Sequence, residues 1–243
     1  MDWLKEILDW SEVWATLMPL IVFFILRPNA QWIKPMVIYL CALLAIFLLI
    51  DITWKHKTLG IEDWTKRVFS FLFPGPKEDD FNNIVFYNIL SPIRLVFITG
   101  FFVAINKSYK KLQLAIAVFF VAFVIINFCF FENINTDFSS RLFSIEAGIV
   151  LLYCLLFIYH VNLSDEIVSI TALSEFWAVT GFTLYASVNF FIFMFFQYLL
   201  VAAKEKFAID IWYVHNISYI VLNLFIAFAI FKAEKTNHDT RVN

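Results

Sequence analysis

The sequence has little charge and very little glycine. Only 16% of its 243 residues are charged and 62% are hydrophobic, whereas an ordinary soluble domain has about 25% charged and about 45–50% apolar residues. Five glycines are too few for a Gly-rich phosphate-binding protein, and a net charge of −2 provides no basic field for nucleic acid. These absences exclude both classes, and the composition that remains is that of a membrane protein.

Cysteine and histidine are also scarce. The three cysteines, Cys41, Cys129 and Cys154, fall inside apolar runs and form no CxxC pair. The four histidines have no HExxH or His-x-x-x-His spacing, and no GxSxG elbow is present. The sequence therefore predicts neither a disulfide framework nor a metal centre, and it argues against an enzyme without deciding the question.

Seven long apolar runs predict seven membrane-spanning helices. A span needs about 20 mostly apolar residues, although about 17 can suffice. The runs cover residues 11–27, 36–54, 83–106, 110–131, 144–163, 176–203 and 211–232. Because the runs do not alternate polar and apolar residues, they predict helices rather than a barrel. We expect an all-α, single-domain bundle of seven transmembrane helices over residues 1–243, surrounded by the lipid bilayer.

The connections between the runs predict an orientation. If the N-terminus is outside, the inside segments carry eight lysines or arginines and the short outside segments carry four. Since inside loops are enriched in positive charge, we expect the N-terminus outside and the C-terminus inside. The amphipathic stretch over residues 61–73 is expected to form an interfacial helix that ends at Pro74-Gly75-Pro76.

The third run carries an arginine near its middle. Arg94 follows Asn83 by eleven residues, which is about 16 Å of helix. Such a charge costs about 2.5–3.5 kcal/mol on insertion scales, so it indicates a functional site. Arg94 shares a helical stripe with Asn83, Tyr87 and Ser91, and we expect this face to point into the bundle.

Neutral polar residues are predicted at the same depth as Arg94. Asn189 shares a stripe with Tyr185 in the sixth run, and Asn223 shares one with Tyr219 in the seventh. The nearest carboxylate, Glu146, is expected near the outer end of the fifth run, about 10 Å from the depth of Arg94. The sequence therefore predicts that Arg94 faces amides and tyrosines, with no carboxylate at its own level.

These residues predict a polar chamber in the outer half of the bundle. Under one hypothesis the chamber binds a small anionic ligand through Arg94; under the other, the same groups and a few waters hold Arg94 as packing. Asp51, Asn88 and Asn127 are further expected members of the chamber. The candidate ligand-binding residues are Arg94, Asn189, Asn223, Tyr87, Tyr185, Tyr219, Glu146 and His215. Glu146 and His215 could also exchange protons if the fifth and seventh runs are adjacent.

The last run contains no lysine. Residues 212–231 have none, and Lys232 stands at the very end. Because retinal binds through a lysine Schiff base within the last span, a retinal protein is disfavoured, and we expect no cofactor.

Two stretches resemble spans of uncharacterised bacterial seven-helix membrane proteins. SEFWAVTGFTLYASVNFF, residues 174–191, resembles their sixth span, with Phe-Trp followed by Gly, Tyr and a polar residue. NIVFYNILSPIRLVFITGFF, residues 83–102, resembles their third span, where a Tyr-Asn pair precedes a position that is often acidic and is Arg94 here. The resemblance implies a receptor-like sensory or accessory protein of the bacterial inner membrane that works beside a membrane protein partner. A small-solute transporter or channel, and a structural subunit of a larger membrane complex, remain the alternatives.

Overall fold

Helices account for almost all of the chain that the structure describes. The structure is a computed structural model, and it describes residues 2–54, 60, 67, 84–163, 169–202 and 205–242. The helices are α1 (Asp2–Asp9), α2 (Ser11–Leu26), α3 (Ile33–Trp54), α5 (Ile84–Ile105), α6 (Lys110–Phe130), α7 (Ser140–Leu163), α8 (Ser174–Ala202) and α9 (Glu205–Val242), with short 3-10 turns η2 (Lys107–Tyr109) and η3 (Ile170–Ala172). The prediction of an all-α bundle is confirmed. The interfacial helix predicted over 61–73 lies outside the described residues, apart from position 67.

Six stretches of helix are long and apolar enough to cross a membrane. They are Ile33–Thr53, Ile84–Ile105, Lys107–Phe130, Ser140–Leu163, Ser174–Phe196 and Asp210–Lys235. The chain is therefore a multi-pass membrane protein in contact with lipid. α2 is a shorter apolar helix of 16 residues with Pro19 inside it, which is about 24 Å against a hydrocarbon core of about 30 Å. A seventh span through α2 stays a prediction.

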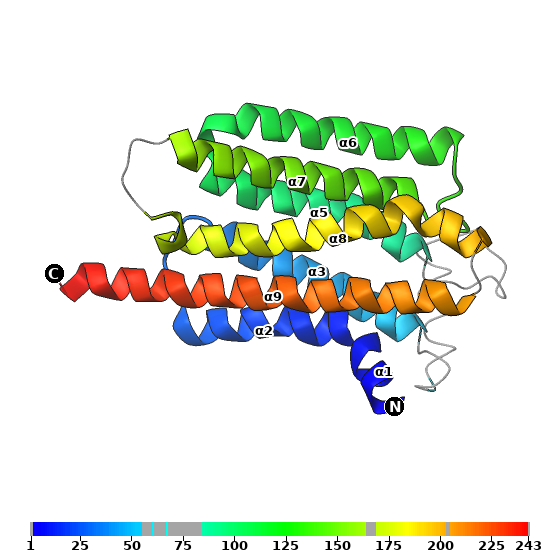
Figure 1. Cartoon of the computed structure of the whole chain (residues 1–243), viewed down its shortest axis with the longest axis horizontal. Coiled ribbons are helices and arrows are strands. Elements are labelled where there is room, and N and C mark those ends of the chain that lie inside the picture. The colour runs from blue at the N-terminus through cyan, green and yellow to red at the C-terminus, as the bar shows by residue number, and fades with distance from the viewer. Residues whose placement is uncertain are drawn as a thin grey trace.

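The helices run side by side along the long axis of the molecule (Figure 1). α9 packs against α8 and α2, α3 packs against α5, and α7 packs against α8 and α5. α6 lies at one edge, where it contacts α5 and α7 and exposes large apolar side chains such as Phe119 and Phe130. Because each helix satisfies its own backbone groups, such exposed apolar faces are suited to lipid contact.

α9 extends well past the bundle. Its 38 residues correspond to about 57 Å, nearly twice the thickness of the hydrocarbon core. Its C-terminal end projects beyond the neighbouring helices in Figure 1. The last predicted span ended at 232, but no glycine or proline occurs between 205 and 242 to stop the helix. The polar residues after the span therefore continue α9.

α8 and α9 approach each other closely at Gly181. A Cβ added to Gly181 would lie 2.7 Å from Cβ of Phe225 and 3.3 Å from the carbonyl oxygen of Leu222. No side chain fits into that space without movement of α9. The glycine therefore determines how near the two helices can lie.

Buried aromatic rings fill the half of the bundle toward the end of α2. Phe101 contacts Trp32, Phe102 and Phe182, with ring centroids 5.8, 5.1 and 5.6 Å away. The rings come from α3 and its preceding turn, α5, α7 and α8, and none is more than 4% exposed. We call this set the aromatic layer: Trp32, Tyr39, Phe101, Phe102, Tyr153 and Phe182. It separates the polar interior described next from the other end of the bundle.

Candidate functional site

Arg94 forms a bidentate ion pair with Glu146 inside the bundle. Arg94 Nε donates to Glu146 Oε1 at 2.5 Å, and Nη2 donates to Oε2 at 2.7 Å. Ser91, one turn earlier on α5, donates its hydroxyl to Oε2 at 2.6 Å. Arg94 is 5% exposed and Glu146 is 2% exposed. Parallel hydrogen bonds of this kind orient both planar groups and balance the two charges.

The prediction that Arg94 faces amides and tyrosines instead of a carboxylate is wrong. It assumed that the fifth span begins near residue 144, whereas α7 begins at Ser140. Six residues of helix then precede Glu146, so its Cα lies about 9 Å into the helix rather than about 3 Å. The remaining difference in depth is covered by two long side chains that extend toward each other.

Tyr185 links the ion pair to a second polar cluster. Arg94 Nη1 donates to the Tyr185 hydroxyl at 3.1 Å, as the sequence predicted for a tyrosine. The backbone carbonyl of Tyr185 accepts a hydrogen bond from Asn189 Nδ2 at 2.7 Å, and the same amide nitrogen donates to Ser218 at 3.0 Å. Asn189 on α8 therefore lies beside Arg94 of α5. Its amide nitrogen donates hydrogen bonds within α8 and to α9.

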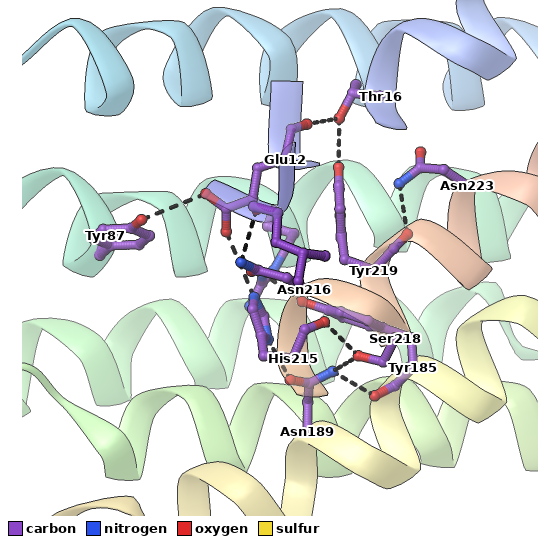
Figure 2. A network of polar contacts seen from close by, with 12 residues as sticks. Glu12, Thr16, Tyr87, Tyr185, Asn189, His215, Asn216, Ser218, Tyr219 and Asn223 are labelled. Atoms are coloured by element: carbon purple, nitrogen blue, oxygen red, sulfur yellow. Dashed lines mark hydrogen bonds and ion pairs between the residues drawn. The ribbon is translucent and has the colours of Figure 1, made fainter. Parts of the chain in front are cut away.

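His215 stands at the centre of the second cluster (Figure 2). Its Nδ1 contacts Asn189 Oδ1, which can only accept, so Nδ1 carries a proton. Its Nε2 lies 3.5 Å from Glu12 Oε1, and the other oxygen of Glu12 accepts a hydrogen bond from Tyr87 at 3.4 Å. The contact between Nε2 and Glu12 is an ion pair only when His215 is protonated. The proton exchange considered between His215 and Glu146 is not supported, since His215 faces Glu12 instead.

α2 and α9 are joined by a second buried contact. Thr16 donates its hydroxyl to the carbonyl of Glu12 at 2.6 Å, and the Tyr219 hydroxyl lies 2.6 Å from the same Thr16 oxygen. Because the single Thr16 proton is used, Tyr219 is the donor. Asn216 reaches the carbonyl of Leu8 at 3.1 Å, and Figure 2 shows these groups grouped around α2 and α9. We call the set the polar network: Glu12, Thr16, Tyr87, Asn189, His215, Asn216, Ser218 and Tyr219.

Asn223 forms no hydrogen bond with Arg94, although the two were predicted neighbours. Its Nδ2 donates to the carbonyl of Tyr219 within α9 at 2.9 Å. Within the described part of the chain, Asn223 Oδ1 and the Tyr39 hydroxyl are fully buried without a hydrogen-bond partner. Such groups favour binding of water or of another polar atom.

Asn88 and Asn127 have a different role from the one expected. Asn88 Nδ2 donates to the carbonyls of Ile134 and Asp137, and its Oδ1 accepts from the backbone N–H of Ser139. Asn127 Nδ2 donates to the Glu132 carboxylate at 2.7 Å. These side chains hold the connection between α6 and α7 over this end of the bundle, rather than lining a chamber.

The space beside the ion pair is small. A cavity of about 10 Å³ is lined by residues that include Arg94, Glu146, Tyr185 and Asn189. That volume is near the lower limit for a single water molecule. A larger ligand therefore needs one of these side chains to move.

Sequence reasoning missed Glu12, although Glu12 on α2 contacts polar groups of two other helices, His215 on α9 and Tyr87 on α5. A signal was present. Glu12 and Thr16 are four residues apart in α2, so they share one face, as do Tyr87 and Ser91 in α5. A polar stripe in the shortest of the predicted spans is therefore the signal that points to Glu12.

No protein-family model, curated protein or solved structure matches this chain.

Proposed function

We propose that the protein is a sensor-like component of a bacterial inner membrane, with its N-terminus outside and its C-terminus inside. The observation that carries this proposal is the double role of α9. Near its start α9 contributes His215, Asn216 and Tyr219 to the polar network, and its other end projects beyond the bundle. A change in the polar network would therefore act on the same helix that projects beyond the bundle.

The contact between Glu12 and His215 makes the polar network sensitive to a change in charge. Glu12 on α2 and His215 on α9 are 7% and 3% exposed, and each has few alternative partners if their contact is altered. A buried polar group without its partner costs about 1–3 kcal/mol, and more when it is charged. Gain or loss of a charge at this contact therefore favours a different position of α9 relative to α2.

The input we propose is a small polar ligand that enters from the α1 side, with an anionic group as its preferred chemistry. Arg94 is the only arginine in the interior among the described residues, and Glu146 already balances its charge. An anion therefore competes with Glu146 for the guanidinium, and the small cavity beside them limits its size. Tyr185 would transmit that competition to Asn189 and His215.

Transport of a small solute is the second candidate, and the aromatic layer argues against it. A transported solute must pass from the polar network to the other end of the bundle. Phe101 and Phe182 are fully buried on that route, with ring centroids 5.6 Å apart. A sensor can keep this layer closed in every state, whereas a transporter must open it.

The native Cys154 separates these two functions. It is 1% exposed in the half of α7 beside the aromatic layer, whereas Cys41 and Cys129 are exposed. In a Cys41→Ser/Cys129→Ser background reconstituted in liposomes, a small water-soluble thiol reagent should leave Cys154 unlabelled, with or without Glu12→Gln. Labelling of Cys154 in the folded protein would contradict the sensor proposal and favour an opening transport path.

A further inference from the structure

A second pocket lies at the opposite end of the bundle from the polar network. It has a volume of about 430 Å³, within the range of about 300–1,000 Å³ that small-molecule sites occupy. Its walls come from the turn between α2 and α3, from the end of α5 with η2, from α7 and from the start of α8. Four separate segments of the chain therefore contribute to one pocket.

The polar side chains of this pocket carry both signs of charge. Lys107 and His160 line it together with Glu175, Gln31 and Ser108. Across the described residues, no hydrogen bond or ion pair engages the side chain of Lys107, Ser108, His160 or Gln31. Lys107 and Glu175 share the pocket without pairing with each other. The pocket thus presents a cationic side and an anionic side that remain available to a ligand.

Glu175 is held in place by a hydrogen bond from its neighbour Ser174. Ser174 donates its hydroxyl to Glu175 Oε2 at 3.0 Å, and the Trp32 indole N–H donates to the Ser174 oxygen at 3.3 Å. Trp32 is 4% exposed, so this short chain of hydrogen bonds is anchored in the protein core. The anchoring orients one carboxylate oxygen and leaves Oε1 to bind a cationic group.

The pocket lies where three candidate spans end, which is the level expected for lipid headgroups. Ile105 is the last residue of α5, Glu175 is the second residue of α8, and His160 is in the last turn of α7. The apolar stretches of all three helices continue away from the pocket into the span. A ligand with a polar head and acyl chains could therefore place its head in the pocket and its chains along the bundle.

We propose that this pocket binds a phosphoethanolamine group, which combines a phosphate and a primary ammonium. Lys107 and His160 bind the phosphate, and Glu175 accepts hydrogen bonds from the ammonium. A purely anionic group would be repelled by Glu175, and a purely cationic one by Lys107. A choline group is a poorer fit, because its methylated nitrogen has no N–H to donate to Glu175.

The test uses the purified full-length protein in detergent and follows its thermal unfolding. Phosphatidylethanolamine should raise the unfolding temperature more than phosphatidylcholine or phosphatidylglycerol with the same acyl chains. Lys107→Gln and Glu175→Gln should each weaken the apparent affinity for phosphatidylethanolamine about tenfold, as expected for loss of a charge-assisted hydrogen bond. Lys235→Gln and Glu234→Gln, which remove the same charges from α9 outside the pocket, should respond like the wild type.

Soluble glycerophosphoethanolamine identifies the source of the group. Stabilisation by the lipid alone indicates a membrane lipid, and equal stabilisation by the soluble compound indicates a free ligand with the same head; both outcomes support the pocket's chemistry. Equal responses to the three lipids would overturn the proposal. So would an undiminished response in both Lys107→Gln and Glu175→Gln, which should fold because, among the described residues, the Lys107 side chain forms no hydrogen bond or ion pair and Glu175 accepts one hydrogen bond.

Discussion

Glu146 reaches Arg94 from the neighbouring helix α7 and receives two of its hydrogen bonds, at 2.5 and 2.7 Å. Both residues are buried, so each is the principal compensation for the other's charge. Breaking a buried pair from one side leaves an uncompensated charge, whereas removing both charges can be nearly neutral.

Arg94→Gln and Glu146→Gln should each destabilise the protein by about 3–5 kcal/mol, and the double variant should regain a large part of that loss. Thermal or denaturant unfolding in detergent measures the difference. Arg141→Gln is the matched control, because Arg141 is 64% exposed and lies 3.9 Å from Glu132. Additive losses in the double variant would contradict the ion pair.

Glu146→Ala should be rescued by formate or acetate. The substitution opens space beside Arg94 and leaves its charge unpaired, so a small carboxylate can occupy the former position of the Glu146 group. Added formate should raise the unfolding temperature of this variant more than chloride at equal ionic strength does. In the double variant Arg94→Gln/Glu146→Ala, formate and chloride should have the same effect on the unfolding temperature. A stronger effect of formate in this variant would show that the anion binds at a place other than Arg94.

Gly181→Ala should destabilise the bundle by about 1–3 kcal/mol, because the added methyl group would lie 2.7 Å from Cβ of Phe225 on α9. Gly148→Ala provides the comparison within the same bundle. Its added methyl group would lie 3.6 Å from the Phe190 ring, which is an ordinary contact, and helix propensity favours alanine by about 1 kcal/mol. Equal effects of the two substitutions on the unfolding temperature would contradict the close approach of α8 and α9.

The bundle was predictable from the sequence because each apolar run is long enough to require a helix. The place of Arg94 near the middle of α5 and its contact with a tyrosine followed from the helical rise and the stripe of polar residues. The partnership with Glu146 did not follow, since it depends on where α7 begins, and an error of one turn moves a side chain by about 5.4 Å. The meeting of Glu12 with His215 was also hidden. It requires α2 and α9, which are far apart in the sequence, to be neighbours, and no local pattern indicates this.

The proposed orientation can be tested with single cysteines at exposed positions. In a Cys41→Ser/Cys129→Ser background, a membrane-impermeant maleimide added to intact cells should label Glu6→Cys and Arg141→Cys. It should label Lys111→Cys and Lys235→Cys only after the membrane is permeabilised. The reverse pattern would show that the N-terminus is inside.

Distances between spin labels show whether the polar network controls the position of α9. Labels at Lys111→Cys on α6 and Lys235→Cys on α9 report on the end of the bundle opposite Glu12. Glu12→Gln removes the charge that faces His215, and Glu6→Gln removes an exposed charge nearby as the control. We predict that Glu12→Gln shifts the distance between the labels by about 2 Å or more, as helix movements in switching proteins do, while Glu6→Gln leaves it unchanged. Superimposable distances in the wild type and a folded Glu12→Gln variant would show that the polar network does not control the position of α9.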